Sequence, residues 1–397
     1  MEHNETKVIR TQPNRSELRE HSSALYLTSS FTFETAEQGR ALFADELEGN
    51  IYSRFSNPNT SEFISKMCLL EGAEDGFAFA TGMAAVFAGF GAILQSGDHI
   101  LASRSVFGST HQLFNKVLSK WGITYTYADA ARPAEWEALI QPNTKLVYIE
   151  TPSNPQLELI DMEWLGKLCK KHNLIFSVDN CFATPYLQTP IQYGADLIIH
   201  SATKFIDGQG RVLGGVIVGR QDLIDEIRFF ARHTGPALSP FNAWILSKSL
   251  ETLPVRMDRH CQNALQLAQY LEGHAQLENT LYPFLPSHPQ YELAKKQMKQ
   301  GGGIVTFVVK GGYARAHQFM DALQIASKTA NLGDTRTTVT HPASTTHSKL
   351  TDDERAAVGI SDGLIRISVG LENINDLIAD VEQALVATKV SKEISFS

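Results

Sequence analysis

Short apolar runs alternate with segments of helical periodicity between residues 60 and 220 of the chain. The apolar runs predict strands at 76–80, 99–103, 123–127, 145–150, 174–179, 196–201 and 212–219. The helical segments between them lie at 61–71, 83–95, 109–120, 133–140 and 161–172. This alternation predicts an α/β protein with a mostly parallel sheet covered by helices.

The remainder of the chain predicts a smaller α+β unit. Residues 221–273 have a helical pattern that is broken between Pro236 and Pro240. Further strands and helices are predicted at 303–310, 314–324, 364–370 and 374–388. Residues 331–349 are rich in Thr, Ser and His without periodicity, which predicts a loop crossing over a site. We expect an N-terminal arm, a large α/β domain and a C-terminal α+β domain over residues 1–60, 61–255 and 256–397.

Composition narrows the class of protein. The 397 residues include 20% charged positions and carry a net charge of −8, with no run of Lys and Arg that would indicate nucleic-acid binding. The four cysteines lie far apart, which favours reduced thiols over a disulfide framework or a zinc site. The N-terminus is polar, and the longest apolar stretch, residues 82–94, is too short to span a bilayer. We therefore expect a cytoplasmic protein.

A lysine follows the strand predicted at 196–201. Lys204 is the only charged residue between Asp196 and Asp207, and a Gly-rich loop comes after it. A lysine at the edge of a core is partly desolvated, which lowers its pKa and makes the amine a nucleophile toward a carbonyl. Ser201 and Thr203 are suitable donors for a phosphate. A solvated surface lysine is the alternative, and it is the commoner one for an isolated motif of this kind.

Polar residues also follow other predicted strands, where ligands bind in open α/β sheets. Gly82 and Met83 open a helix, and backbone amides at a helix start bind anions. Asp179 ends a buried strand and needs a cation, such as a protonated pyridine nitrogen. Structural roles are the alternatives: a helix-entry glycine at Gly82 and a helix cap at Asp179. No GxGxxG follows an early strand, which argues against a nicotinamide enzyme. Together the amine, the carboxylate and the phosphate donors indicate pyridoxal 5′-phosphate (PLP).

Six motifs in order carry a family resemblance: YSRFSNP, ATGMAA, ETPSNP, SVDN, HSATKF and RISVGLE. The chain resembles the Cys/Met-metabolism family of PLP enzymes, which includes cystathionine γ-synthase, the γ- and β-lyases and the homoserine-ester sulfhydrylases. The resemblance implies an aspartate-aminotransferase-like, type I fold. It also implies a homotetramer built from two active dimers, acting on small amino-acid substrates.

The resemblance further implies roles for individual residues. Lys204 would carry the cofactor and move protons, while Asp179 would hold the pyridine nitrogen. The implied phosphate ligands are Gly82, Met83, Ser201 and Thr203, joined by Tyr52 and Arg54 from a partner subunit. The implied substrate ligands are Asn154, which also lies near the 3-oxygen of the ring, Asn331 and Arg366, which would bind the α-carboxylate. A flexible arm remains the alternative for Tyr52 and Arg54, and a strand-edge charge the alternative for Arg366.

Two departures narrow the predicted reaction. Phe107 stands where many members of the family have a tyrosine, so it could stack on the cofactor but has no phenolic proton for a lyase reaction. The stretches at 201–215 and 330–347 resemble the sulfhydrylase branch, most of all the O-succinylhomoserine sulfhydrylases. The predicted reaction is γ-replacement with sulfide, which forms homocysteine for methionine biosynthesis. The alternatives are a cystathionine γ-synthase, an O-acetylhomoserine sulfhydrylase, a lyase, or a non-enzymatic anion-binding protein.

A cation is expected to recognise the second carboxylate of a succinyl group. Arg211 lies seven residues after Lys204 in the Gly-rich loop, and we predict that it has this role. The alternative is an ion pair between Arg211 and Asp207.

Overall fold

The seven strands expected between residues 60 and 220 form one sheet in the computed structural model, which describes residues 3–13, 15–348 and 351–389. In chain order they are β1 (Asp75–Phe79), β2 (His99–Ser103), β3 (Thr124–Ala128), β4 (Thr144–Glu150), β5 (Ile175–Asp179), β6 (Leu197–Ser201) and β7 (Gly215–Gly219). Their spatial order is β1-β7-β6-β5-β4-β2-β3, and β7 runs opposite to the other six strands. The predicted fold class is confirmed.

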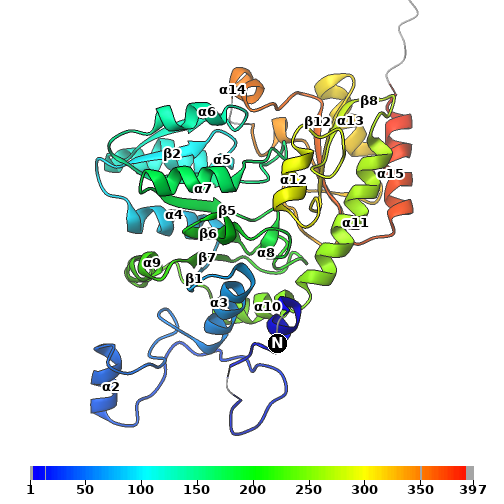
Figure 1. Ribbon diagram of the computed structural model, residues 1–397. Coiled ribbons are helices and arrows are strands. Elements are labelled where there is room, and N and C mark those ends of the chain that lie inside the picture. The colour runs from blue at the N-terminus through cyan, green and yellow to red at the C-terminus, as the bar shows by residue number, and fades with distance from the viewer. Residues whose placement is uncertain (1–2, 14, 349–350, 390–397) are drawn as a thin grey trace, which may run out of the picture.

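Helices cover both faces of this sheet because successive side chains of a strand point to opposite faces. Val147 and Ile149 of β4 join one core, whereas Leu146 and Tyr148 join the other. The first core packs against α3, α7 and α10, and the second against α4 and α9 (Figure 1). The helices up to residue 250 are α1 (Asn4–Arg10), α2 (Ala36–Phe43), α3 (Pro58–Glu71), α4 (Gly82–Ile93), α5 (Gly108–Gln112), α6 (Pro133–Trp136), α7 (Met162–Lys171), α8 (Thr184–Leu187), α9 (Gln221–Thr234) and α10 (Pro240–Leu250).

A second sheet lies beside the first (Figure 1). Its strands, in spatial order, are β10 (Ser327–Lys328), β11 (Thr338–Thr340), β12 (Leu364–Ser368), β9 (Ile304–Val309) and β8 (Leu277–Leu281). The helices of this part are α11 (Leu253–Leu271), α12 (Tyr291–Gln297), α13 (Gly312–Ala322), α14 (Asp352–Ala357) and α15 (Ile374–Ala387). The sequence did not predict β8, because its polar residues interrupt the apolar alternation.

Helix α11 connects the two parts. Leu253 and Met257, near its beginning, belong to the core of the large sheet. Leu267 and Leu271, near its end, belong to the core of the second sheet. The domain boundary predicted at residue 255 therefore falls within a helix that both cores share.

Local structure also differs from the sequence-based expectation elsewhere. The helix predicted at 109–120 is interrupted: α5 ends at Gln112, and a π-helical turn and a 3₁₀ turn follow it. The predicted N-terminal arm contains two helices, and α1 packs onto the main core through the buried side chain of Val8. The loop predicted at 331–349 contains β11, and its last residue, Lys349, lies outside the described residues. Over the described part of the chain, no helix has the length and apolar character needed to cross a membrane.

Candidate active site

A cavity of about 530 Å³ lies at the carboxyl ends of β4, β5 and β6. It is bounded by the start of α4, by residues before α5, by the segment after β10 and by β12. The predicted residues that line it are Gly82, Met83, Phe107, Asn154, Asp179, Ser201, Thr203, Lys204, Asn331 and Arg366. Ten predicted residues from distant parts of the sequence therefore meet around one space.

The start of α4 forms one end of the cavity. Thr81 caps this helix by accepting a hydrogen bond from the amide of Ala84 at 3.0 Å. The amides of Gly82 and Met83 belong to the first turn, where no intrahelical acceptor exists. A Cβ on Gly82 would lie 2.6 Å from the Cβ of Ser201, so only glycine fits between helix and strand. This end of the cavity is suited to an anion such as a phosphate.

Lys204 lines the cavity with its amine held by a neighbouring side chain. Its Nζ donates a hydrogen bond to Oδ1 of Asn331 at 2.6 Å. Burial lowers the pKa of Lys204, although the nearby thiol of Cys181 partly opposes that shift, and the positive charge of Arg366 lowers the pKa further. A lowered pKa increases the fraction of neutral amine, which is the form that attacks a carbonyl.

Two carboxyl groups lie side by side where β4 and β5 end. Glu150 and Asp179 are register partners on these parallel strands. Burial raises the pKa of Asp179 to about 6, whereas the amide of Cys181, which donates to its Oδ1 at 2.9 Å, and the nearby His200 act in the opposite direction. Burial and the charge of Asp179 hold the pKa of Glu150 well above its usual range. A positively charged group placed beside Asp179 would stabilise its ionised form.

Sequence reasoning missed Glu150, although the same criterion that selected Asp179 applies to it. Both carboxylates end an apolar strand. Glu150 also accepts a hydrogen bond from the backbone amide of Phe107 at 2.8 Å, so it holds the segment that carries this ring. Beneath the site, the fully buried His200 and Glu71 are joined by a 2.6 Å contact that no motif had indicated.

Arg366 is almost completely buried on β12 and faces Asn154. Its guanidinium donates to Oδ1 of Asn154 at 2.9 Å and to the carbonyl oxygens of Ala330 and Asn331. Its Nε is buried and has no hydrogen-bond partner among the described residues. Burial lowers the pKa of Arg366 to about 10, which still leaves the group charged at neutral pH. A buried cation with an unpaired N–H at a cavity wall is suited to a carboxylate ligand.

Three predicted residues lie outside this cavity. Tyr52 is 41% exposed, and Arg54 contacts the ring of Phe55 and the carbonyl oxygen of Arg232 instead. Arg211 adopts the alternative arrangement, because its Nε donates to Oδ1 of the buried Asp207 at 3.0 Å. This ion pair fixes the Gly-rich loop, and Arg211 is not among the described residues that line the cavity, so the structure does not support the role expected for Arg211.

The fold and the cavity together define a PLP-dependent enzyme of the type I fold. The chain belongs to the family of Cys/Met metabolism PLP-dependent enzymes, whose model matches residues 5–386. An O-succinylhomoserine sulfhydrylase of Pseudomonas aeruginosa is 48% identical over 383 residues, which are 96% of this chain and 95% of that protein.

Some other relatives are named for different reactions. An L-methionine gamma-lyase of Porphyromonas gingivalis is 44% identical over 92% of both chains. The crystal structure of a putative O-acetylhomoserine (thiol)-lyase from Campylobacter jejuni has a TM-score of 0.93 and 34% identity, covering 96% of this chain and 99% of its own. That structure contains N′-pyridoxyl-lysine-5′-monophosphate. The family therefore establishes PLP dependence, while the named reactions of relatives diverge.

The residues around the cavity fit PLP. Gly82 leaves a cradle at the start of α4 that a larger residue would fill, and no described residue hydrogen-bonds the Ser201 hydroxyl beside it. Lys204 offers an amine with a lowered pKa, and Asp179 offers a carboxylate for a ring nitrogen. These three features match the phosphate, the carbonyl and the pyridine nitrogen of the cofactor.

Proposed function

We propose that this chain replaces the succinyl group of O-succinylhomoserine with hydrosulfide, which yields homocysteine and succinate. The observation that carries the proposal is the 48% identity to the O-succinylhomoserine sulfhydrylase of P. aeruginosa over almost the whole of both chains. The proposal is also supported by the cavity around Lys204, since no tyrosine is among the described residues that line it. Phe107 lines the cavity where related lyases place a tyrosine, and it has no proton to donate in an elimination.

The proposed proton carrier is Lys204. PLP, when bound, supplies a carbonyl carbon for covalent attachment and a ring that accepts the electron pair released at Cα. The Lys204 amine then removes the Cα proton of the substrate and returns protons later in the reaction. Its lowered pKa favours the neutral base, and the side-chain oxygen of Asn331 orients Nζ at 2.6 Å.

Arg366 and Asn154 are the proposed substrate ligands. Arg366 would bind the α-carboxylate through its unpaired Nε, since Asn154 and two carbonyl oxygens already fix the rest of the guanidinium. Such fixation reduces the entropy lost when the substrate is bound. Asp179 would hold the protonated ring nitrogen, and Gly82, Met83, Ser201 and Thr203 would bind the phosphate.

The proposal includes an assembly of two active dimers. Tyr52 and Arg54 do not reach the cavity of their own chain, and the arm that carries them exposes large apolar side chains such as Phe43. An exposed apolar segment is suited to a contact with a second copy of the chain. We therefore assign Tyr52 and Arg54 to the phosphate site of the neighbouring subunit.

Purified protein loaded with PLP tests the function directly. The protein is given O-succinylhomoserine or O-acetylhomoserine with sulfide or cysteine, and separately methionine. Homocysteine, cystathionine, 2-oxobutanoate and methanethiol are measured. We expect homocysteine from the succinyl ester and sulfide as the fastest reaction. Cystathionine as the main product would instead identify a cystathionine synthase. Release of 2-oxobutanoate and methanethiol from methionine would favour the lyase named among the relatives.

A further inference from the structure

A second cavity of about 170 Å³ adjoins the one around Lys204. Asn154 lines both cavities, and the other walls of the second cavity include Arg104, His111, Tyr127 and His347. The cavity therefore begins beside the residue that holds Arg366. The shared residue places the second cavity beside the part of the first cavity that Arg366 lines.

Arg104 is the permanently charged residue of this cavity. No Asp or Glu is among the described residues that line it. The side chain of Arg104 is exposed, and it forms no hydrogen bond or ion pair with another residue of the described chain. In contrast, the guanidinium of Arg211 is already bound to Asp207. Arg104 is therefore a free guanidinium in a chain whose net charge is negative.

The remaining polar groups of the cavity are donors and acceptors of hydrogen bonds. Burial and the charge of Arg366 lower the pKa of His347 to about 4, so its imidazole is neutral at pH 7. His111 contacts the hydroxyl of Tyr127 at 2.7 Å, and burial raises the pKa of this tyrosine, so the hydroxyl keeps its proton. A negatively charged ligand would meet hydrogen-bonding groups here and no ionised acid in the wall.

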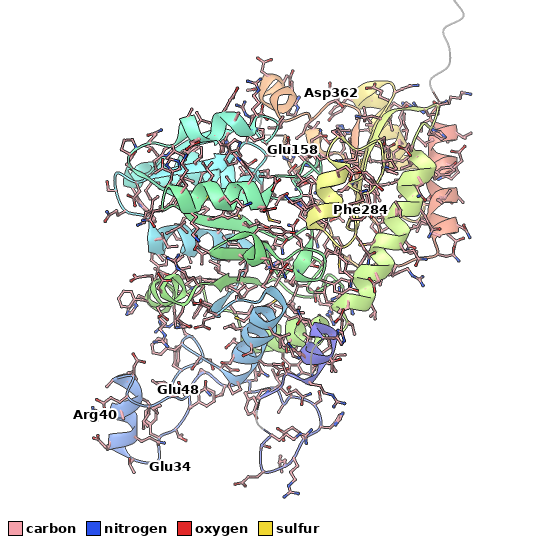
Figure 2. The ribbon with its side chains drawn as sticks, in the orientation of Figure 1. Glu34, Arg40, Glu48, Glu158, Phe284 and Asp362 are labelled. Carbon is pink, nitrogen blue, oxygen red and sulfur yellow. The ribbon has the colours of Figure 1, made fainter. Side chains whose placement is uncertain are left out.

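Glu158 is the acid that needs to be considered, because it lies where the two parts of the molecule meet (Figure 2). It does not line the cavity, and its Oε2 accepts a hydrogen bond from the hydroxyl of Ser105 at 3.0 Å. Burial raises the pKa of Glu158, which reduces its tendency to ionise. Ser105 thus separates this carboxyl from the interior of the cavity.

We propose that the second cavity binds the terminal carboxylate of the succinyl group, with Arg104 as its ligand. This inference rests on the proposed function. Succinyl and acetyl esters of homoserine differ by one CH₂–COO⁻ unit, so a selective enzyme needs a cation beyond the acyl carbon. A guanidinium can bind a carboxylate through two parallel hydrogen bonds. Arg104 makes the cavity a specificity pocket for dicarboxylic acyl groups.

Steady-state kinetics of Arg104→Met with both esters and sulfide test this assignment. We expect kcat/KM for O-succinylhomoserine to fall by roughly ten- to a hundredfold, as for loss of one charge-assisted contact. The value for O-acetylhomoserine should change by less than about threefold, because that ester places no charge in the pocket. Arg132→Met is the matched control: Arg132 is exposed, pairs with Asp129 and Glu135, and should affect neither ester.

Equal losses on the two esters would overturn the proposal, since they would mean that Arg104 only supports the surrounding segment. Unchanged kinetics on both would overturn it as well. If the wild-type enzyme turned over neither ester, the proposed function would be wrong. The assignment of the pocket would then be tested by ligand binding without turnover. Calorimetric titration with succinate and with butyrate should then show a succinate preference that Arg104→Met removes. No such preference in the wild type would reject the pocket.

Discussion

The cavity around Lys204 and the N-terminal arm differ in how their side chains are held. Around the cavity, Lys204 and Arg366 are bound by groups of their own chain, at Asn331 and Asn154. On the arm, Arg40 is exposed and contacts only acids of its own segment, and Phe43 is 64% exposed. Figure 2 shows Glu34, Arg40 and Glu48 far from the two sheets. The side chains of the cavity are thus held by their own chain, whereas the arm exposes apolar side chains, as is typical of a segment that contacts another surface.

The largest effect is expected from Lys204→Ala, which removes the proposed proton carrier from the cavity. Turnover should fall by at least about a thousandfold, because both covalent attachment of PLP and proton transfer depend on this amine. Borohydride should no longer fix the cofactor to the protein. Absorbance spectra and peptide mapping of the reduced protein measure this directly.

Lys167→Ala provides the matched control, since Lys167 is exposed on α7 and pairs with Glu163. It should keep full activity and normal fixation by borohydride. Recovery of the reduced cofactor on a lysine other than Lys204 would show that the assignment is incorrect.

The second prediction concerns the arm. Arg54→Ala alone should be inactive or nearly so, because a neighbour's phosphate would lose a charged ligand. Mixing it with inactive Lys204→Ala should restore activity, since a hybrid dimer has one site that contains both native residues. Random pairing would recover about a quarter of the wild-type activity.

Mass spectrometry must first demonstrate that hybrids have formed. Hybrids without recovered activity would contradict a shared site. Tyr52 and Arg54 would then act within their own chain. Recovery would show that the arm of one subunit completes the phosphate site of another.

The same contrast explains what the sequence could predict. Asp179 and Lys204 are predictable because Asp179 ends a buried strand and Lys204 closely follows one, and parallel strands end at one edge of a sheet. All seven strands of the large sheet are predicted, because each is a short apolar run in the sequence. Glu150 also ends a buried strand, but within its motif a role is predicted only for Asn154.

Other features have no local signal in the sequence. Arg104 is a single exposed arginine, and its relation to His347 exists only after distant segments pack together. Tyr52 and Arg54 stand out because their own segment has no core that would explain them, but only the family resemblance implies that they bind a phosphate. The spacing of Arg211 is compatible with both a substrate contact and an ion pair with Asp207, and spacing alone does not distinguish the two.

The smallest effect is expected on stability, from Asp179→Asn in protein prepared without PLP. The pKa of Asp179 is raised from 3.8 to about 6 in the folded chain, so the folded state holds a proton that the unfolded state releases between these values. Stability therefore falls as pH rises through this window. At about 1.4 kcal/mol per pKa unit, the penalty above pH 6 is at most about 3 kcal/mol.

Asparagine removes this penalty and also the repulsion that Asp179 exerts on Glu150. The variant without PLP should unfold at a higher urea concentration than the wild type at pH 8, and this advantage should decrease toward pH 4. With PLP present the order should reverse, because the asparagine cannot stabilise a protonated ring nitrogen. A variant less stable at pH 8 without cofactor would show that Asp179 contributes structural bonds that outweigh its desolvation. The reversal itself is the decisive result, because it distinguishes a role of Asp179 in binding the cofactor from a role in stabilising the fold.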